Sequence, residues 1–196
     1  MSGETLNVLG VVGSLNRDSI TRVAITHFAK LLAAEGCAVN LRDLLHEPVP
    51  IHNPDSADDI PEVASLAVLV SRADVFLLGT PDYHGGMSGA MKNFLDHFWR
   101  EFAGKLFVTI VASHEKGLTV TDQLRTVARQ CYAWTLPYGL SLEESLDVKD
   151  GEIVEEKFRK RLAMAARDTI NYGTLLARQR AADLAGNQPG FMARHR

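Results

Sequence analysis

Cysteine is almost absent from this chain of 196 residues, which has only Cys37 and Cys131. The two lie far apart and outside any metal-binding or redox spacing, so we expect no disulfide framework and a reducing, cytoplasmic compartment. Long apolar runs are missing as well: no segment approaches the ~20 residues that cross a bilayer, and residues 1–6 do not form an export signal. These absences predict a soluble protein without a membrane partner.

An excess of positive charge is also missing. The 21 Lys and Arg residues are outnumbered by 24 Asp and Glu residues, so the net charge is -3 and gives no general attraction to nucleic acid. Hydrophobic residues make up 46% of the chain and charged residues 23%, as in ordinary globular proteins. A chain of this length can bury a large core, and we expect one domain over residues 1–184.

Apolar runs alternate with segments of helical periodicity along the whole chain, a pattern typical of parallel strands joined by helices. Strands are expected over residues 6–12, 37–41, 75–79, 106–112 and 134–138. The last is expected at an edge, because Pro137 removes a backbone donor. The sequence thus predicts the flavodoxin-like α/β fold, a doubly wound five-stranded parallel sheet in the order 2-1-3-4-5 with helices on both faces. A six-stranded dinucleotide-binding sheet would need one more strand, and the C-terminal third offers only helix.

Two helix boundaries and the chain end carry further expectations. Asp59, followed by Pro61 and Glu62, predicts a capped helix start, and helical periodicity predicts a long final helix over residues 153–184. Residues 185–196 show no period, so we expect a C-terminal tail that is either mobile or pinned to a neighbouring subunit.

The loop after the first strand, residues 13–21, is a candidate anion site. In an open parallel sheet, ligands bind beyond the carboxyl ends of the strands, where the strand order reverses. Ser14, Ser19 and Thr21 offer hydroxyls there, Arg17 a cation, and the helix start backbone donors, which together suit a phosphate monoester. The alternative is that Ser19 or Asp18 only caps the helix. No third glycine and no Gly-Lys-Ser/Thr sequence follows, which disfavours dinucleotide and ATP loops.

The loop after the third strand, residues 80–89, is a candidate platform for a planar ligand. Its glycines allow close backbone approach, and Tyr83 and His84 offer ring surface and hydrogen-bonding edges. The alternatives are that Tyr83 packs on the next helix and that His84 is an ordinary turn residue.

Residues 79–96, which read GTPDYHGGMSGAMKNFLD, resemble the signature of the NADPH-dependent FMN reductase family. The Gly13-Ser14-Leu15 turn with Ser19 and Thr21 is similar to that family's phosphate loop, and the resemblance covers about residues 5–145. The chain departs from the family in having Asn16 where Arg is frequent, with Arg17 next to it. It also has Asp82 and His84 where Glu and Asn are common, and no glycine pair after the fourth strand.

The resemblance implies an FMN cofactor, NADPH or NADH as co-substrate, a small-molecule electron acceptor and a homodimer or homotetramer. It places the FMN phosphate on Ser14, Asn16, Arg17, Ser19 and Thr21. It places the isoalloxazine ring beside Pro81, Asp82, Tyr83, His84 and Gly85, and the pyrimidine end of the ring beside Ser113, His114 and Gly117.

The chemistry of such a site belongs mainly to the cofactor, so no further catalytic side chain is expected. The backbone of residues 113–117, or a cationic His114 or Lys116, would stabilise negative charge on the reduced flavin. A flavodoxin-like electron carrier without a nicotinamide site is the alternative function, and an interaction domain without flavin is a third. His46, His52 and His97 have no metal-ligand spacing, so no metal site is expected. Ser88 lacks the Gly-x-Ser-x-Gly spacing of a hydrolase.

Overall fold

The computed structural model describes residues 5–55, 60–114 and 117–195. The strands are β1 (Asn7–Val12), β2 (Ala38–Asp43), β3 (Val75–Tyr83), β4 (Gly86–Met87), β5 (Leu106–Ala112), β6 (Trp134–Thr135), β7 (Leu140–Leu142), β8 (Val148–Lys149) and β9 (Glu152–Ile153). The α-helices are α1 (Ile20–Ala34), α2 (Pro61–Arg72), α3 (Gly89–Asp96), α4 (Leu118–Gln130), α5 (Glu144–Asp147) and α6 (Glu156–Ala185). The described residues also form the 3-10 helices η2 (Arg100–Phe102) and η3 (Phe191–His195).

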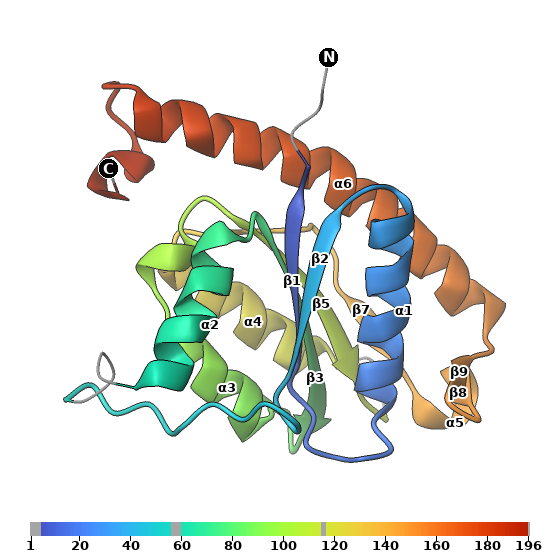
Figure 1. The fold of residues 1–196 in the computed structure, drawn as a ribbon. Coiled ribbons are helices and arrows are strands. Elements are labelled where there is room, and N and C mark those ends of the chain that lie inside the picture. Colours follow the sequence, from blue (N-terminus) through green and yellow to red (C-terminus); the bar gives the residue numbers. More distant parts are fainter. Residues whose placement is uncertain (1–4, 56–59, 115–116, 196) are drawn as a thin grey trace.

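The main sheet is parallel in the order β2-β1-β3-β5, and both β6 and β7 pair with β5. Helices α1 and α6 cover one face of this sheet and helices α2, α3 and α4 cover the other (Figure 1). This arrangement confirms the predicted flavodoxin-like fold. Among the described residues, no helix has both the length and the apolar character that crossing a bilayer requires.

The fifth strand differs from the prediction, because it is split in two. β6 pairs with Leu106 and Phe107 at the start of β5, whereas β7 pairs with Ile110–Ala112 near its end. Pro137 lies between the two pieces and has no backbone N–H for the ladder, so the chain leaves the sheet and rejoins it. The edge position predicted for this strand is correct.

One helix start differs from the prediction, and the predicted cap of another lies outside the described residues. Ile60 precedes α2 without a side-chain cap, and Asp59, the expected cap, lies outside the described residues. The final helix begins at Glu156 rather than near residue 153, because Ile153 belongs to the β8–β9 hairpin. Glu155 caps this helix by accepting a hydrogen bond of 2.6 Å from the N–H of Phe158.

Each face of the sheet has its own apolar core. Alternate residues of β1 enter the two cores, Val8 and Val12 on the α1 side and Leu9 and Val11 on the other side. Gly79 of β3 lies on the α1 side, where a Cβ atom would come within 2.4 Å of the Ile25 side chain. The missing side chain at this position therefore lets the first half of α1 lie against the sheet.

The C-terminal tail packs on its own chain. The ring of Phe191 stacks on that of Tyr132, with centroids 6.3 Å apart. Met192 is buried, and its sulfur lies beside Gly104. The residues expected to be mobile or pinned to a neighbouring subunit thus have apolar contacts within the chain, because two of them are large apolar side chains that η3 turns back toward the domain.

Lys105 is a buried cation at the start of β5, with 1% of its surface exposed. Its ammonium group donates hydrogen bonds of 2.8 Å to the carbonyl oxygens of Val70 and Ser71, which end α2. Burial, together with the positive charge of Arg180, lowers the pKa of Lys105 from 10.5 to about 7. The unfolded chain then binds more protons than the folded chain between about pH 7 and pH 10.5, so stability should rise with pH across this window.

We expect Lys105→Met to remove this pH dependence. Between about pH 7 and pH 9, the free energy of unfolding of the wild type should rise by roughly 2 kcal/mol relative to that of the variant. Urea unfolding followed by circular dichroism at both pH values measures this difference. Parallel pH trends in the two proteins would contradict the proposed titration of Lys105.

Candidate functional site

The carboxyl ends of β1, β3 and β5 lead into three loops at one edge of the sheet, the lower edge in Figure 1. These loops, with the first turn of α1 and the last residues of β3, contain every residue that the sequence assigned to cofactor binding. The first joins β1 to α1, the second continues β3, and the third joins β5 to α4.

The β1–α1 loop presents hydroxyls and backbone donors to one point. Ser14, Ser19 and Thr21 are buried, and the Ser19 oxygen caps α1 by accepting a hydrogen bond of 3.3 Å from the N–H of Arg22. The first backbone N–H groups of a helix, here those of Ile20 and Thr21, have no partner within the helix. Free donors and the positive end of the helix dipole together suit an anion.

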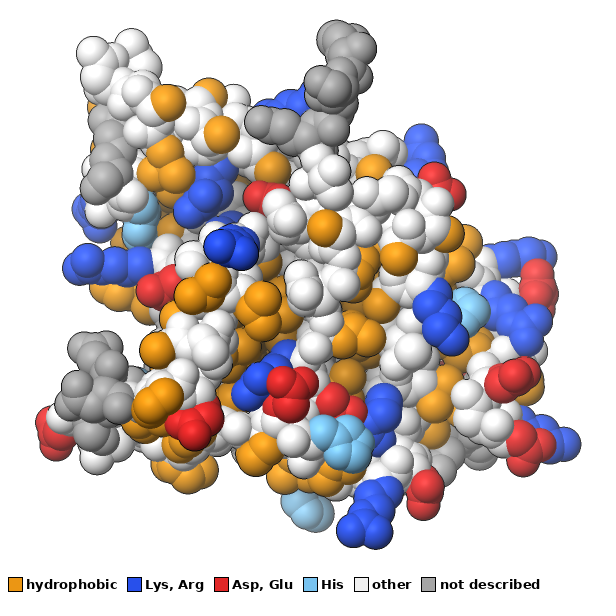
Figure 2. Space-filling model, in the orientation of Figure 1, with side chains coloured by type: hydrophobic (Ala, Val, Ile, Leu, Met, Phe, Trp, Pro, Cys, Tyr) orange, Lys and Arg blue, Asp and Glu red, His pale blue; other side chains and the backbone are white. Residues whose placement is uncertain are grey.

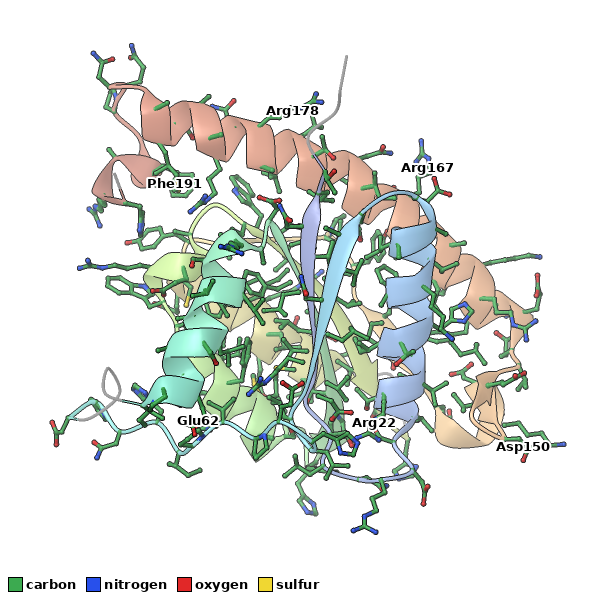
Figure 3. The ribbon with its side chains drawn as sticks, viewed as in Figure 1. Arg22, Glu62, Asp150, Arg167, Arg178 and Phe191 are labelled. Carbon is green, nitrogen blue, oxygen red and sulfur yellow. The ribbon has the colours of Figure 1, made fainter. Side chains whose placement is uncertain are left out.

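Arg22 determines the shape of this loop, and the sequence analysis did not identify it. Its Nη1 donates hydrogen bonds of 2.9 Å to the carbonyl oxygens of Asn16 and Arg17, and its Nη2 donates one of 3.4 Å to Ser14. Its Nε and Nη2 also bind the carboxylate of Asp43 at the end of β2. Figure 3 labels Arg22 at the end of α1 that faces the loop. The guanidinium therefore holds three loop carbonyls in place, while the N–H groups of Asn16 and Asp18 are bound by the side chains of Ser14 and Asn16.

The electrostatics of Asp43 are consistent with a strong pairing. Burial alone would raise its pKa, but hydrogen bonds from Arg22 and from the N–H of Leu45 outweigh that effect and lower it. A sequence signal for Arg22 did exist, because a cation in the first turn of a helix opposes the helix dipole and needs a compensating anion. Arg17, the cation that the sequence favoured, is exposed and does not line the cavity described below.

The second loop is a hairpin rather than an irregular loop. β3 continues to Tyr83 and pairs with β4, and the turn between them places His84 at φ 57° and Gly85 at φ 77°. Two successive residues with positive φ are typical of the type I′ hairpin turn. The Asp82 carboxylate accepts a hydrogen bond of 2.8 Å from the N–H of Gly85, and Tyr83 is half exposed.

Gln123 of α4 fixes this turn from outside. Its side-chain nitrogen donates a hydrogen bond of 3.0 Å to the carbonyl oxygen of Gly85. Its side-chain oxygen accepts one of 3.1 Å from the N–H of Met87. Sequence reasoning missed Gln123 as well, because it lies on a helix that the periodic pattern marked only for its apolar face.

Ser88 connects the hairpin with the first loop. Its hydroxyl donates to the carbonyl oxygen of Gly13 and accepts from the N–H of Met91, so it caps α3. Its backbone N–H donates to the Thr80 hydroxyl at 3.0 Å. Because the Ser88 hydroxyl is buried and fully engaged, it has a structural role and does not act as a hydrolase nucleophile.

The third loop contributes Ser113, His114 and Gly117. The Ser113 hydroxyl lies 3.4 Å from the Asp82 carboxylate, which brings the second and third loops together. His114 is exposed, and Gly117 precedes the first residue of α4. Lys116, the other cation proposed from the sequence, lies outside the described residues.

Two adjoining cavities lie among these loops. The smaller, of about 140 Å³, is lined by the predicted residues Ser14, Asn16, Ser19, Thr21, Pro81, Asp82, Tyr83, Ser113 and His114. The larger, of about 1010 Å³, shares Asp82, Ser113 and His114 with it and adds His84, Gly85 and Gly117. Its far wall is formed by β7, α5, the residue between them and α6. The wall includes Glu143, Asp147 and Arg161, which the sequence analysis had not selected.

The described residues contain no group of three His, Cys, Asp or Glu side chains placed to hold a metal ion. His52 and His97, considered from the sequence, pack ring against ring with centroids 4.9 Å apart. Nε2 of His97 lies 2.8 Å from the carbonyl oxygen of Pro50, and Asn93 of the same helix binds the same loop. These two histidines therefore attach the β2–α2 loop to α3.

Comparison with known proteins identifies the family. A family model described as NADPH-dependent FMN reductase matches residues 6–146. The chain belongs to the NADPH-dependent FMN reductase family. This confirms the resemblance seen in the sequence: the protein is an enzyme, and its cofactors are FMN and NAD(P)H. The alternative of an electron carrier without a nicotinamide site is not supported.

Relatives of this FMN reductase family member include bacterial enzymes. The chain is 30% identical over 155 residues to a protein named NADPH azoreductase from Bacillus sp. (strain OY1-2), covering 77% of this chain and 84% of that one. It is 25% identical to the NADPH-dependent FMN reductase ArsH of Shigella flexneri, covering 90% of this chain and 72% of that one. In fold it matches FerB, a flavoenzyme NAD(P)H:(acceptor) oxidoreductase from Paracoccus denitrificans, with a TM-score of 0.73, 22% identity and coverage of 86% and 97%.

The donor set of the site fits FMN at both ends. The helix start and the buried hydroxyls suit the phosphate. At the other end, no heavy atom beyond the neighbouring residues lies within 4 Å of the position where Gly85 would carry a Cβ, so a planar ring has room over that backbone. Asp82, Ser113 and His114 line both cavities and carry hydrogen-bonding groups of the kind that the polar edge of such a ring would need.

We expect Arg22→Met to raise the Kd for FMN by about tenfold or more, because loss of the guanidinium frees the loop carbonyls to turn toward the phosphate. Fluorescence titration of the FMN-free protein measures this effect. Arg167→Met is the matched control, since Arg167 is exposed on α6 and, among the residues that the structure describes, its one ion pair is with its neighbour Asp168. Equal FMN affinities in Arg22→Met and Arg167→Met would contradict the role of Arg22.

Proposed function

We propose that this enzyme is an NAD(P)H-dependent FMN oxidoreductase whose second substrate is a small planar acceptor, such as free flavin, a quinone or an azo compound. The observation that carries the proposal is the pair of adjoining cavities, which share Asp82, Ser113 and His114. The larger cavity is in the size range of ligand pockets in known proteins. The names of the relatives, among them azoreductases and a 2-hydroxy-1,4-benzoquinone reductase from Burkholderia sp., support this class of acceptor.

Different groups of the predicted residues would bind different parts of the cofactor. Ser14, Asn16, Ser19 and Thr21 would hold the phosphate, with Arg17 as an outer cation. Pro81, Asp82, Tyr83, His84 and Gly85 would border the ring, and Ser113, His114 and Gly117 would reach its pyrimidine end. FMN held by these residues would supply the redox chemistry, namely hydride transfer from the nicotinamide to flavin N5 and electron transfer to the acceptor.

The protein's own contribution is positioning and charge compensation. The hairpin turn is fixed by Asp82 on one side and Gln123 on the other, so it offers a rigid edge to a ring. His114 borders both cavities, where its cationic form would stabilise negative charge at the pyrimidine end of the ring. Tyr83, with 52% of its surface exposed, has freedom to cover a ring from outside.

Anaerobic reduction tests the proposal. The FMN-loaded protein is mixed with NADPH, or separately with NADH, and the flavin absorbance is followed in a stopped-flow instrument. We expect rapid bleaching by at least one nucleotide, and reoxidation when free FMN, a benzoquinone or an azo dye is then added. FMN with nucleotide but without protein is the control. A bound flavin that neither nucleotide bleaches, or that no acceptor reoxidises, would overturn the proposal.

The same measurement on His114→Ala isolates the role of this side chain. We expect FMN to bind with nearly unchanged affinity, because the phosphate loop is intact, and bleaching to slow by about tenfold or more. His46→Ala is the control, since His46 lies in the loop after β2, outside both cavities. Normal bleaching in His114→Ala would remove His114 from the mechanism.

We further propose that residues 1–184 act as one flavin-binding domain, and that the protein forms a homodimer or homotetramer in the cytoplasm. The exposed apolar residues of α6, Met164, Tyr172 and Leu175, support an interface on that helix. The cysteines Cys37 and Cys131 are unpaired, as is usual for a reducing compartment. Sedimentation of the FMN-loaded protein should give at least twice the mass of one chain, and a monomer would exclude the assembly.

A further inference from the structure

A second cleft lies on the flank of α1, apart from the cofactor cavities. It has a volume of about 510 Å³ and is bounded by α1, by the β8–β9 hairpin and by the start of α6. Its charged and titratable lining residues are Arg22, His27, Lys30, Glu152 and Arg159. Figure 2 shows Lys, Arg and His side chains close together over this side of α1, and Figure 3 marks the hairpin by Asp150.

The charges of this cleft do not balance. Arg22 is paired with Asp43, and all five of its N–H groups have acceptors, so it adds no donor to the cleft. Lys30 and Arg159, in contrast, form no ion pair with any carboxylate of the described residues. Two cations therefore face a single carboxylate, that of Glu152.

Arg159 is held in place on the wall of the cleft. Its Nε and Nη2 both donate to the carbonyl oxygen of Ile153 in the hairpin. A guanidinium has five N–H groups, so those on Nη1 and the second on Nη2 remain for a ligand. A fixed guanidinium beside a flexible ammonium is a donor combination that suits phosphoryl oxygens.

His27 lies in the positive electrostatic field of Arg159 and Lys30. Burial lowers its pKa, and the charges of Arg159 and Lys30 lower it further. Arg22 and Glu152 are the other charged groups that line the same cleft. An anion bound between Lys30 and Arg159 would offset their charges and favour the protonated imidazole, which would then become a third donor.

We propose that the cleft between α1, the β8–β9 hairpin and α6 is a second anion site, which binds a phosphoryl or diphosphoryl group through Lys30, Arg159 and His27. Lys30 and Arg159 are positively charged, and His27 would become so when an anion binds. Together they match a ligand that carries at least two negative charges. A phosphate of the nicotinamide nucleotide and a free polyphosphate share this chemistry. The site itself does not depend on the electron acceptor, whereas its use by the nucleotide rests on the proposed function.

Calorimetry on the FMN-loaded protein tests the site, because FMN occupies the phosphate loop and prevents the probe from binding there. Inorganic pyrophosphate is titrated at low ionic strength, and the flavin spectrum is recorded before and after to verify that FMN stays bound. We expect saturable binding that Lys30→Gln and Arg159→Gln each weaken by about tenfold. Glu152→Gln should strengthen binding, since it removes the opposing carboxylate.

Lys157→Gln is the matched control, because it removes one positive charge from the same end of α6 at a residue outside the cleft. Its affinity for pyrophosphate should equal that of the wild type. An unfolded variant would lose affinity for pyrophosphate, so the increase in affinity expected for Glu152→Gln cannot result from unfolding. No saturable binding by the wild type, or equal losses in Lys30→Gln and Lys157→Gln, would overturn the proposal.

Steady-state kinetics then separates the two sources of the anion. If the cleft takes a phosphate of the co-substrate, Lys30→Gln and Arg159→Gln raise KM for NADPH more than for NADH, and adenosine 2′,5′-bisphosphate competes with pyrophosphate. If it takes a free polyphosphate, both values of KM stay unchanged while pyrophosphate still binds. Either result supports the site. Pyrophosphate binding can be measured even if no nucleotide reduces the flavin, so failure of the proposed function and failure of this site can be told apart.

Discussion

The architecture of the cofactor site depends on the guanidinium of Arg22. It is the only group in the described structure that joins the β1–α1 loop to the end of β2, and it does so with all of its N–H groups. A loop of seven residues between a strand and a helix has many conformations, and most of them would turn some carbonyl oxygens toward the anion site. By binding the carbonyls of Ser14, Asn16 and Arg17, Arg22 restricts these conformations and keeps the three carbonyl oxygens engaged, so that they are not free to turn toward an anion at the start of α1.

The break in the edge strand is the second constraint, and it gives the site its depth. Because Pro137 interrupts the ladder, the chain rejoins β5 at Ile110–Ala112, beside the carboxyl end where the third loop begins. The segment that follows β7 then extends past the sheet and forms the far wall of the larger cavity, with α5 and Arg161. In an unbroken edge strand that starts at residue 134, residue 140 rather than Leu142 would pair with Ala112 at that end of β5. A missing backbone donor thus contributes to the space for a second substrate.

The sequence predicted the parts of this molecule that depend on local pattern. Continuous apolar runs such as Leu106–Ala112 located the central strands, and the order of strands and helices fixed the topology and hence the edge where the loops meet. It failed where a partner is distant in the chain. Arg22 binds Asp43, and Gln123 binds the turn at Gly85, through contacts that no periodicity encodes. The two-residue strands β8 and β9 are too short to show a period, which is why the predicted final helix wrongly included Ile153.

The net charge of the chain does not predict the electrostatic field around α1. A net charge of -3 suggests weak attraction for anions, yet the start of this helix presents free N–H groups and its flank presents Lys30 and Arg159. Charges beyond about 10 Å are screened at ordinary ionic strength, so a bound phosphate responds to the few groups that line its site rather than to the sum over the surface. Fixed donors at a helix start and an arginine held by the backbone need little reorganisation when an anion arrives. For this reason a slightly acidic protein can present two separate sets of anion-binding donors along one helix.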